Sequence, residues 1–218
     1  MKVIPAILSE RVEECERMLK EAASFTDYVQ IDLMDGVFVP SRSFPGERVN
    51  ELGHSIPFEV HLMVQDPLHL MGAIRHPSLK QAIFHLESRV DPFTFVSAMK
   101  ERGIGTGLAI RPETSDEEFH TFAPQVDMIL FLTVDPGFYG SPFKTEVLEK
   151  IEETRRRFPG KPIAVDGAVS LDNLNLFVEL GVDAVCVGSR IFLGGKPEEN
   201  YRRFSDKAKE LEDRVHRE

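Results

Sequence analysis

Two aspartates and one histidine have the types and spacing that could perform proton transfer. Asp32, His61 and Asp166 each end a short, mostly apolar run. An ionisable group after such a run adds little to a core, but it places a functional group at the edge of a sheet. If the three runs are parallel strands of one barrel, the side chains converge at its C-terminal mouth, where the active sites of such barrels lie. Two carboxylates and an imidazole meeting there predict proton transfer, metal binding, or both.

These three side chains would suffice to invert a stereocentre next to a carbonyl. A carboxylate on each side of a sugar carbon can remove a proton from one face and return one to the other. The intermediate is an enediolate, whose negative charge needs electrostatic stabilisation. A divalent cation bound by Asp32, His61 and Asp166 would supply it. Met34 and Met63 follow closely and are expected to form a polarizable apolar wall. Each residue alone also has an ordinary structural explanation, so the prediction depends on the set.

Glycine-bearing loops follow the last three of the predicted strands. Barrels often bind a phosphate group between the loops after strands seven and eight, through backbone N–H groups. Glycine lets the backbone come close to the anion. The alternative is that these glycines only form tight turns, but their presence in three consecutive loops favours phosphate. The candidate phosphate-binding residues are Gly137, Gly140, Gly167, Ala168, Gly188 and Ser189.

Eight short runs rich in Val, Ile, Leu and Phe alternate with longer amphipathic stretches. Such runs, with few polar residues, are typical of parallel strands buried on both faces. The predicted strands cover residues 2–7, 28–33, 57–62, 81–85, 104–110, 126–133, 162–166 and 183–187. Eight alternations predict an α/β fold, a single (β/α)8 TIM barrel that forms one domain over residues 1–218. A doubly wound open sheet is the alternative, but no G-x-G-x-x-G pattern follows the first predicted strand.

The stretches between the runs carry helix periodicity and helix-end signals. Asp91 and Pro92 are expected to begin one helix as N-cap and first residue, and Gly103 to end it. Ser170 is expected to cap another helix, which Gly181 ends. The predicted helices cover residues 10–24, 92–102, 144–157, 171–180 and 198–213.

Composition excludes several classes of protein. The chain has 218 residues, of which 42% are apolar and 28% charged, as in ordinary globular proteins. Its formal net charge of −10 argues against general binding to nucleic acid or anionic membranes. No apolar run approaches the roughly 20 residues that span a bilayer, and no signal-peptide h-region precedes the first strand. Cys15 and Cys186 are expected to be buried free thiols, which fits a cytoplasmic protein. The sequence leaves the oligomeric state open, a homo-oligomer included.

Several motifs together resemble the ribulose-phosphate 3-epimerase family. The blocks M-D-G-x-F-V-P and H-L-M-V occur together with V-D-P-G-F, V-D-G and a G-S pair in matching order. They lie at residues 34–40, 61–64, 134–138, 165–167 and 188–189. The resemblance implies interconversion of D-ribulose 5-phosphate and D-xylulose 5-phosphate in the pentose phosphate pathway, with Asp32 and Asp166 as the acid/base pair. It also implies a divalent ion bound by Asp32, His61, Asp166 and a fourth residue, with Zn2+ as the leading expectation and Fe2+, Mn2+ or Co2+ as alternatives.

The candidate fourth ligand departs from the family pattern. The family usually has a histidine two positions before the first catalytic aspartate, where this chain has Gln30. An amide oxygen can coordinate a metal, but it is a weaker ligand than imidazole for transition ions. The alternative is a buried amide that hydrogen-bonds the carboxylate. Leu132 stands where the family has a methionine in the site wall. The other departures are Ala6, Val37, Ser41, Tyr139, Ser141 and Ala168.

These departures keep two further functions open besides the leading one. Ala6, Leu132 and Tyr139 motivate an epimerase of a related ketose phosphate, such as a hexulose 6-phosphate. Gln30 motivates a barrel that binds a sugar phosphate with little or no turnover. In every case the partner is a small-molecule sugar phosphate.

Three further residues near the predicted strand ends have weaker signals. His85 ends the fourth predicted strand and either faces the mouth or packs in the core. Glu87 is expected in a solvated loop. Arg111 is expected either to form a salt bridge at the rim or to reach an anionic substrate.

Overall fold

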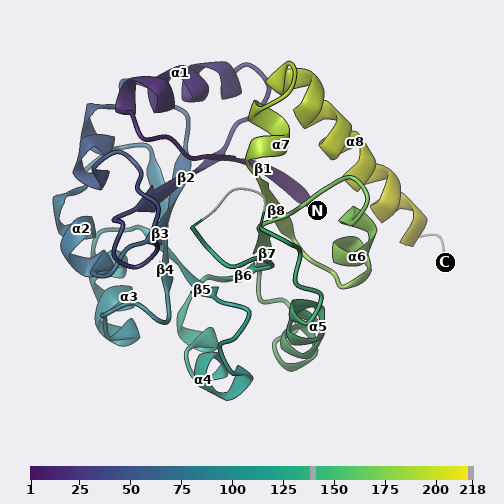
Figure 1. Ribbon diagram of the computed structural model, residues 1–218. Coiled ribbons are helices and arrows are strands. Elements are labelled where there is room, and N and C mark those ends of the chain that lie inside the picture. The colour runs from purple at the N-terminus through teal and green to yellow at the C-terminus, as the bar shows by residue number, and fades with distance from the viewer. Residues whose placement is uncertain (138–140, 216–218) are drawn as a thin grey trace.

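The computed structural model describes residues 1–137 and 141–215, and it shows a closed barrel with helices around it (Figure 1). The strands run parallel in the order β1 to β8, and β8 pairs back onto β1. The expected (β/α)8 TIM barrel is therefore confirmed. The strands are β1 (Lys2–Ile7), β2 (Val29–Met34), β3 (Phe58–Met63), β4 (Leu79–His85), β5 (Gly105–Ile110), β6 (Met128–Leu132), β7 (Ile163–Asp166) and β8 (Ala184–Val187).

The helices form an outer ring around the strands (Figure 1). The last helix, α8, packs against α6, α7 and β1 and so joins the end of the chain to its beginning. Among the described residues, no helix has the length and apolar character needed to cross a membrane. The helices are α1 (Val12–Ala22), α2 (Pro67–Ala73), α3 (Pro92–Glu101), α4 (Asp116–His120), α5 (Val147–Arg157), α6 (Leu174–Glu179), α7 (Ser189–Phe192) and α8 (Pro197–Val215), with 3-10 turns η1 (Gly46–Glu51) and η2 (Ala123–Gln125).

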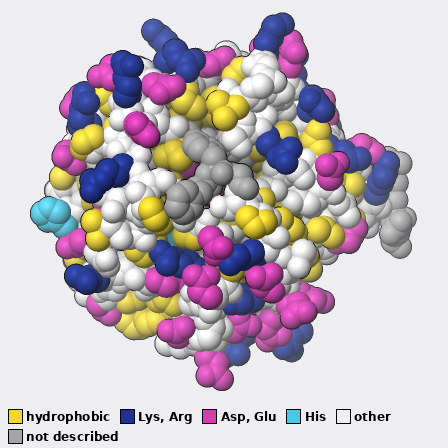
Figure 2. Space-filling view, in the orientation of Figure 1, with side chains coloured by type: hydrophobic (Ala, Val, Ile, Leu, Met, Phe, Trp, Pro, Cys, Tyr) yellow, Lys and Arg dark blue, Asp and Glu magenta, His cyan; other side chains and the backbone are white. Residues whose placement is uncertain are grey.

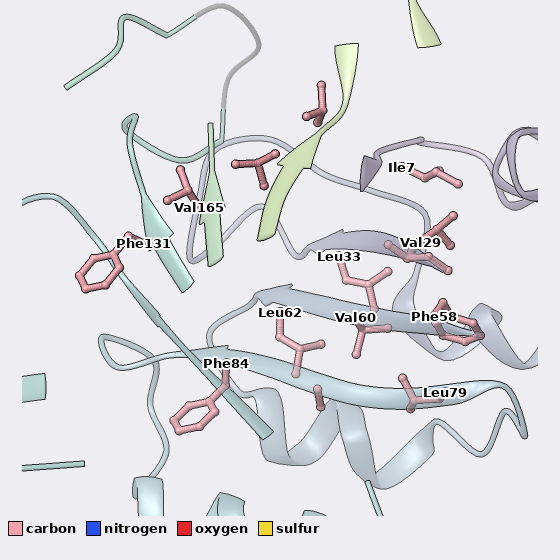
Figure 3. Packing of buried hydrophobic residues seen from close by; sticks show 14 of the residues in the cluster. Ile7, Val29, Leu33, Phe58, Val60, Leu62, Leu79, Phe84, Phe131 and Val165 are labelled. Carbon is pink, nitrogen blue, oxygen red and sulfur yellow. The ribbon is translucent and has the colours of Figure 1, made fainter. Parts of the chain in front are cut away.

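Alternate residues of β2 and β3 serve two different purposes. Side chains two apart on a strand point to the same side. One set joins the large apolar core between barrel and helices, as Figure 3 shows for Val29, Leu33, Phe58, Val60 and Leu62. The intervening set faces the barrel interior and is mostly polar. Its polar members are Gln30, Asp32, Glu59 and His61, all buried, and Met34 and Met63 follow them at the strand ends. The apolar set thus fixes the strands, which leaves the other face free to carry polar groups.

Helix ends follow the predicted signals in one case and not in another. The Asp91 side chain accepts a hydrogen bond from the backbone N of Thr94 at 2.8 Å, and Pro92 begins α3, as expected. The expected cap at Ser170 is wrong, because α6 begins only at Leu174. There the Asn173 side chain accepts a hydrogen bond from the Ser170 backbone N at 2.8 Å instead. Residues 171–173 therefore form a turn rather than the first turn of the helix.

Candidate active site

A cavity of about 520 Å³ opens at the C-terminal end of the barrel. Its walls include the side chains of Asp32, His61 and Asp166, which come from β2, β3 and β7. In the same orientation as Figure 1, Figure 2 shows acidic and basic side chains interspersed around the rim of this face. The remaining predicted residues that line the cavity are Met34, Met63, Leu132, Gly137, Gly167, Ala168, Gly188 and Ser189. Gly140 lies outside the described residues, and so does the departure at Tyr139.

The imidazole of His61 lies between the two carboxylates. Its Nδ1 is 3.3 Å from Asp32 Oδ1 and 3.3 Å from Asp166 Oδ2. Pairing of β2 with β3 places Asp32 directly opposite His61, and closure of the barrel brings β7 to the same point. The three ligand atoms lie within 4.8 Å of one another, so one metal ion could contact all three.

The side-chain amide of Gln30 forms hydrogen bonds with both carboxylates. Its Nε2 donates to Asp32 Oδ1 at 2.8 Å and to Asp166 Oδ2 at 2.9 Å. Its Oε1 accepts a hydrogen bond from Cys186 Sγ at 3.1 Å. A carboxylate can only accept, so the amide NH2 has to face the aspartates while they are ionised. Of the two roles that the sequence leaves open, these contacts match the amide that hydrogen-bonds the carboxylates. Direct metal ligation by Oε1 would require the amide to turn over.

The buried position of this group changes the pKa of its members. Burial raises the pKa of Asp32, and the nearby charge of Asp166 raises it further. Burial alone would lower the pKa of His61, but the carboxylates of Asp166 and Asp32 outweigh burial and raise it to about 9. A positive charge on the imidazole thus offsets the charge of two carboxylates in a buried site. A divalent cation would offset the same charge, in place of the proton on Nδ1.

The donor set fits a divalent metal ion. Among the described residues, His61 Nδ1 is buried and has no hydrogen-bond partner with acceptable geometry, although two carboxylate oxygens lie nearby. One imidazole nitrogen and two carboxylate oxygens are ligands that Zn2+ and neighbouring transition metals accept. Asp32, His61 and Asp166 would hold such an ion at the cavity, where it could supply positive charge to a bound substrate.

Two glycines of the predicted phosphate loops lie where a side chain would meet neighbouring atoms. Gly167 has φ +103°, and a Cβ there would lie 2.5 Å from Val134 Cγ2. A Cβ on Gly188 would lie 3.1 Å from the carbonyl oxygen of Ala6. Both glycines are thus explained by close approach of neighbouring strands and loops, with or without a bound anion.

The loop after β7 has a strained residue and a side chain that holds it. Ala168 has φ +46°, a left-handed conformation that costs a residue with a Cβ roughly 1–2 kcal/mol. Asn173 donates from Nδ2 to the carbonyl oxygen of Ala168 at 3.1 Å and accepts from the backbone N of Ser170 at 2.8 Å. Asn173 itself lines the cavity, so the loop is fixed where it meets the site.

Sequence reasoning did not single out Arg190, and it missed the contacts that Glu87 and Arg111 make. Arg190 lines the cavity directly after Ser189, and the only sequence cue is its place in the eighth loop.

Glu87 is not solvated as expected, because its side chain is 23% exposed and contacts His85 and Thr114. Among the described residues Arg111 forms no salt bridge: its guanidinium donates to the carbonyl oxygen of Phe38 at 3.2 Å and lies over the Phe38 ring. Cys15 and Cys186 are buried free thiols, as predicted.

Comparison with known sequences identifies similar proteins along nearly the whole chain. Residues 2–192 match a family model described as the ribulose-phosphate 3 epimerase family. A ribulose-phosphate 3-epimerase from Candida glabrata is 30% identical over 204 residues, covering 85% of this chain and 82% of that protein. One from Helicobacter pylori is 31% identical over 199 residues, with 88% and 91% covered. A protein from Oryza sativa subsp. japonica, named as the cytoplasmic isoform, is 29% identical over 208 residues, with 91% and 90% covered.

Solved structures show the same fold at lower sequence identity. The 3-hexulose-6-phosphate synthase of Salmonella typhimurium superimposes with a TM-score of 0.70 at 16% identity, covering 97% of this chain and 100% of that one. The N-(5'-phosphoribosyl)anthranilate isomerase of Pyrococcus furiosus gives 0.67 at 20% identity, with 96% and 99% covered. At these identities the likeness concerns the barrel fold alone.

Proposed function

The chain belongs to the ribulose-phosphate 3-epimerase family, and we propose that it interconverts D-ribulose 5-phosphate and D-xylulose 5-phosphate by inverting C3. The family makes it an epimerase. The observation that carries the proposal is the pair of carboxylates, Asp32 and Asp166, held in one cavity by a shared amide donor from Gln30. A site that only bound a sugar phosphate would have no need of two carboxylates held by one amide in the same cavity.

The two carboxylates would act from opposite faces of C3. One removes the proton next to the carbonyl, and the other returns a proton to the opposite face of the planar enediolate. Burial raises the pKa of Asp32, which makes its carboxyl group a better proton acceptor than a solvent-exposed aspartate. Gln30 keeps the two carboxylates in place during the proton exchange at C3, because its NH2 donates to both.

Asp32, His61 and Asp166 would bind a divalent metal ion, with Zn2+ as the leading candidate and Fe2+, Mn2+ or Co2+ as alternatives. When bound, such an ion would stabilise the negative charge that develops on the substrate oxygens. Met34 and Met63 are buried at the mouth beside these ligands, and with Leu132 they would keep the reacting carbon in an apolar surrounding.

The phosphate group would bind between the loops after β7 and β8. Gly167, Ala168, Gly188 and Ser189 line this side of the cavity, and Arg190 adds a positive charge there. Gly137 lines the cavity from the sixth loop, which the Ser41 hydroxyl ties to the loop after β2 by donating to the Gly137 carbonyl oxygen. The glycines alone do not identify a phosphate site, so this assignment is supported chiefly by the family and by the charge of Arg190.

An assay of the purified protein tests the proposal. D-ribulose 5-phosphate is supplied with and without Zn2+, Mn2+, Co2+ or Fe2+, and D-xylulose 5-phosphate is measured. A hexulose 6-phosphate serves as the competing substrate, because Ala6 and Leu132 at the cavity wall depart from the family pattern. The proposal requires the pentulose to be turned over with the higher kcat/KM. Preference for the hexulose, or binding without turnover of either sugar, would contradict it.

A cytoplasmic location completes the proposal. It is supported by the two free thiols and by the similarity to the Oryza sativa cytoplasmic isoform.

A further inference from the structure

A second buried histidine contacts His61 on the side away from the carboxylates. His61 Nε2 lies 2.9 Å from His85 Nε2, and both side chains are at most 1% exposed. His85 is the last residue of β4 and Phe38 covers its ring, with the two centroids 4.8 Å apart. Two ring nitrogens at this distance share one proton, because two hydrogens would collide and two lone pairs would repel. The tautomer of one histidine therefore determines the tautomer of the other.

Glu87 lies on the far side of His85. Its Oε2 is 3.4 Å from His85 Nδ1, close enough for a charge contact but not aligned for a hydrogen bond. Its Oε1 accepts from the backbone N of Arg111 at 3.2 Å and from the Thr114 hydroxyl, so the carboxylate is fixed in position. An anion beside Nδ1 favours the hydrogen of His85 on that nitrogen and leaves Nε2 with its lone pair.

We propose that Glu87 and His85 are positioning residues that keep the ring hydrogen of His61 on Nε2, so that Nδ1 presents its lone pair between Asp32 and Asp166 to a divalent cation. Metal-binding histidines commonly donate their other ring N–H to a group that fixes their orientation, and loss of that group weakens metal binding. Here the acceptor is an imidazole, which can accept only while Glu87 holds its hydrogen on the other nitrogen. The inference rests on the metal site of the proposed function and not on the identity of the sugar.

The neighbours of His85 include an aromatic ring and the Glu87 carboxylate. Phe38 lies against the ring of His85, and the guanidinium of Arg111 lies 4.2 Å from the centroid of Phe38. Within the part of the chain that the structure describes, His85 Nδ1 has no hydrogen-bond partner of good geometry, and Glu87 is the charged group beside it.

Replacing Glu87 by glutamine should invert both tautomers. The Arg111 backbone N–H can only donate, so the amide oxygen of the variant has to stay where Oε1 is. The NH2 group then faces His85 Nδ1 and donates to it, which moves the ring hydrogen of His85 to Nε2. His61 Nε2 must now accept, so the hydrogen of His61 moves to Nδ1 and blocks the metal. Glu87→Ala removes the acceptor without adding a donor.

Calorimetric titration with Zn2+ of the metal-stripped wild type and both variants tests this order. Glu87→Gln should lose about 10–100-fold in affinity, the usual effect of such outer groups, and more than Glu87→Ala loses. A purely structural role predicts the reverse order, because glutamine preserves the contact with Arg111 and alanine does not. Asp135→Asn is the matched control: it removes an exposed carboxylate next to the cavity-lining Pro136, and its affinity should stay near wild type.

Nuclear magnetic resonance of histidine-labelled, metal-free protein gives a readout independent of metal. Burial lowers the pKa of His85, and the spectra are taken above the raised pKa of His61, so that both rings are neutral and the tautomer of His85 can be read from its two ring nitrogens. Wild type should carry the hydrogen on Nδ1, and Glu87→Gln on Nε2. An unchanged tautomer in Glu87→Gln, a larger affinity loss in Glu87→Ala, or no Zn2+ binding by the wild type would each overturn the inference. Loss of epimerase activity with intact Zn2+ binding would overturn only the proposed function.

Discussion

Gln30 determines how the two carboxylates of the site face each other. Its amide nitrogen donates to Asp32 and Asp166, while Cys186 donates to its oxygen, and the side chain is fully buried. A buried amide satisfied on both ends is held in one orientation. Such an arrangement lets the carboxylates differ in protonation without moving apart, which is what a two-sided proton exchange at one carbon requires.

Removing the acid/base capacity of either aspartate should abolish most of the turnover. Asn has nearly the shape of Asp but cannot carry the transferred proton. We expect Asp32→Asn and Asp166→Asn each to lower kcat by at least about 10²-fold, the lower range for loss of a positioned acid or base. Steady-state assays with D-ribulose 5-phosphate measure this, and thermal unfolding checks that both variants fold. Near-native kcat in either variant would remove that residue from the acid/base pair.

Gln30→His should tighten the binding of Zn2+. The change replaces an amide, whose NH2 faces the carboxylates, by an imidazole that can donate a lone pair. We expect the dissociation constant to fall at least about tenfold, or about 1.4 kcal/mol. Gln30→Met, which has similar length but neither amide nor imidazole, separates the two effects: it should not tighten binding. Equal Zn2+ affinity of wild type and Gln30→His would show that Gln30 does not weaken the site.

At the scale of elements, strands were more predictable than the loops that join them. Apolar runs such as 28–33 identify strands because burial on both faces demands such residues, and β2 is displaced from that run by one residue. The beginning of α6 was not predictable, because Ser170 and Asn173 are both good capping residues and only tertiary contacts with the Ala168 loop decide between them. Glu87 looks solvated for the same reason, since its partners come from residues 24 and 27 positions later.

Asn173 should control phosphate binding through the loop after β7. We expect Asn173→Ala to raise the KM for D-ribulose 5-phosphate roughly three- to tenfold with little change in kcat, because two hydrogen bonds of about 1 kcal/mol each hold the loop. Asn50→Ala is the matched control. Asn50 makes the same pair of bonds, to the Ala73 oxygen and from the Arg75 nitrogen, in loops that precede β3 and β4 at the other end of the barrel. An equal KM change in both variants, or none in Asn173→Ala, would count against the assignment.

At the scale of the whole molecule, closure of the barrel is what assembles the site. Asp32, His61 and Asp166 were predictable as a set because parallel strands in one barrel place all their carboxyl ends at one mouth. The orientation of Gln30 was not, because it depends on contacts with Asp166 and Cys186, which lie 136 and 156 residues away in the chain. Local pattern therefore indicates which residues reach the mouth, while the distances between strands decide which atoms meet there.

In the proposed reaction, Asp32 and Asp166 exchange the proton at C3 of a ketopentose phosphate with solvent. The most direct measurement incubates the metal-loaded protein with D-ribulose 5-phosphate in D2O and locates deuterium in the sugars by nuclear magnetic resonance. We expect D-xylulose 5-phosphate that carries deuterium at C3, with this labelling suppressed in Asp32→Asn and Asp166→Asn. No deuterium at C3 of either sugar, or deuterium only at another carbon, would contradict this expectation.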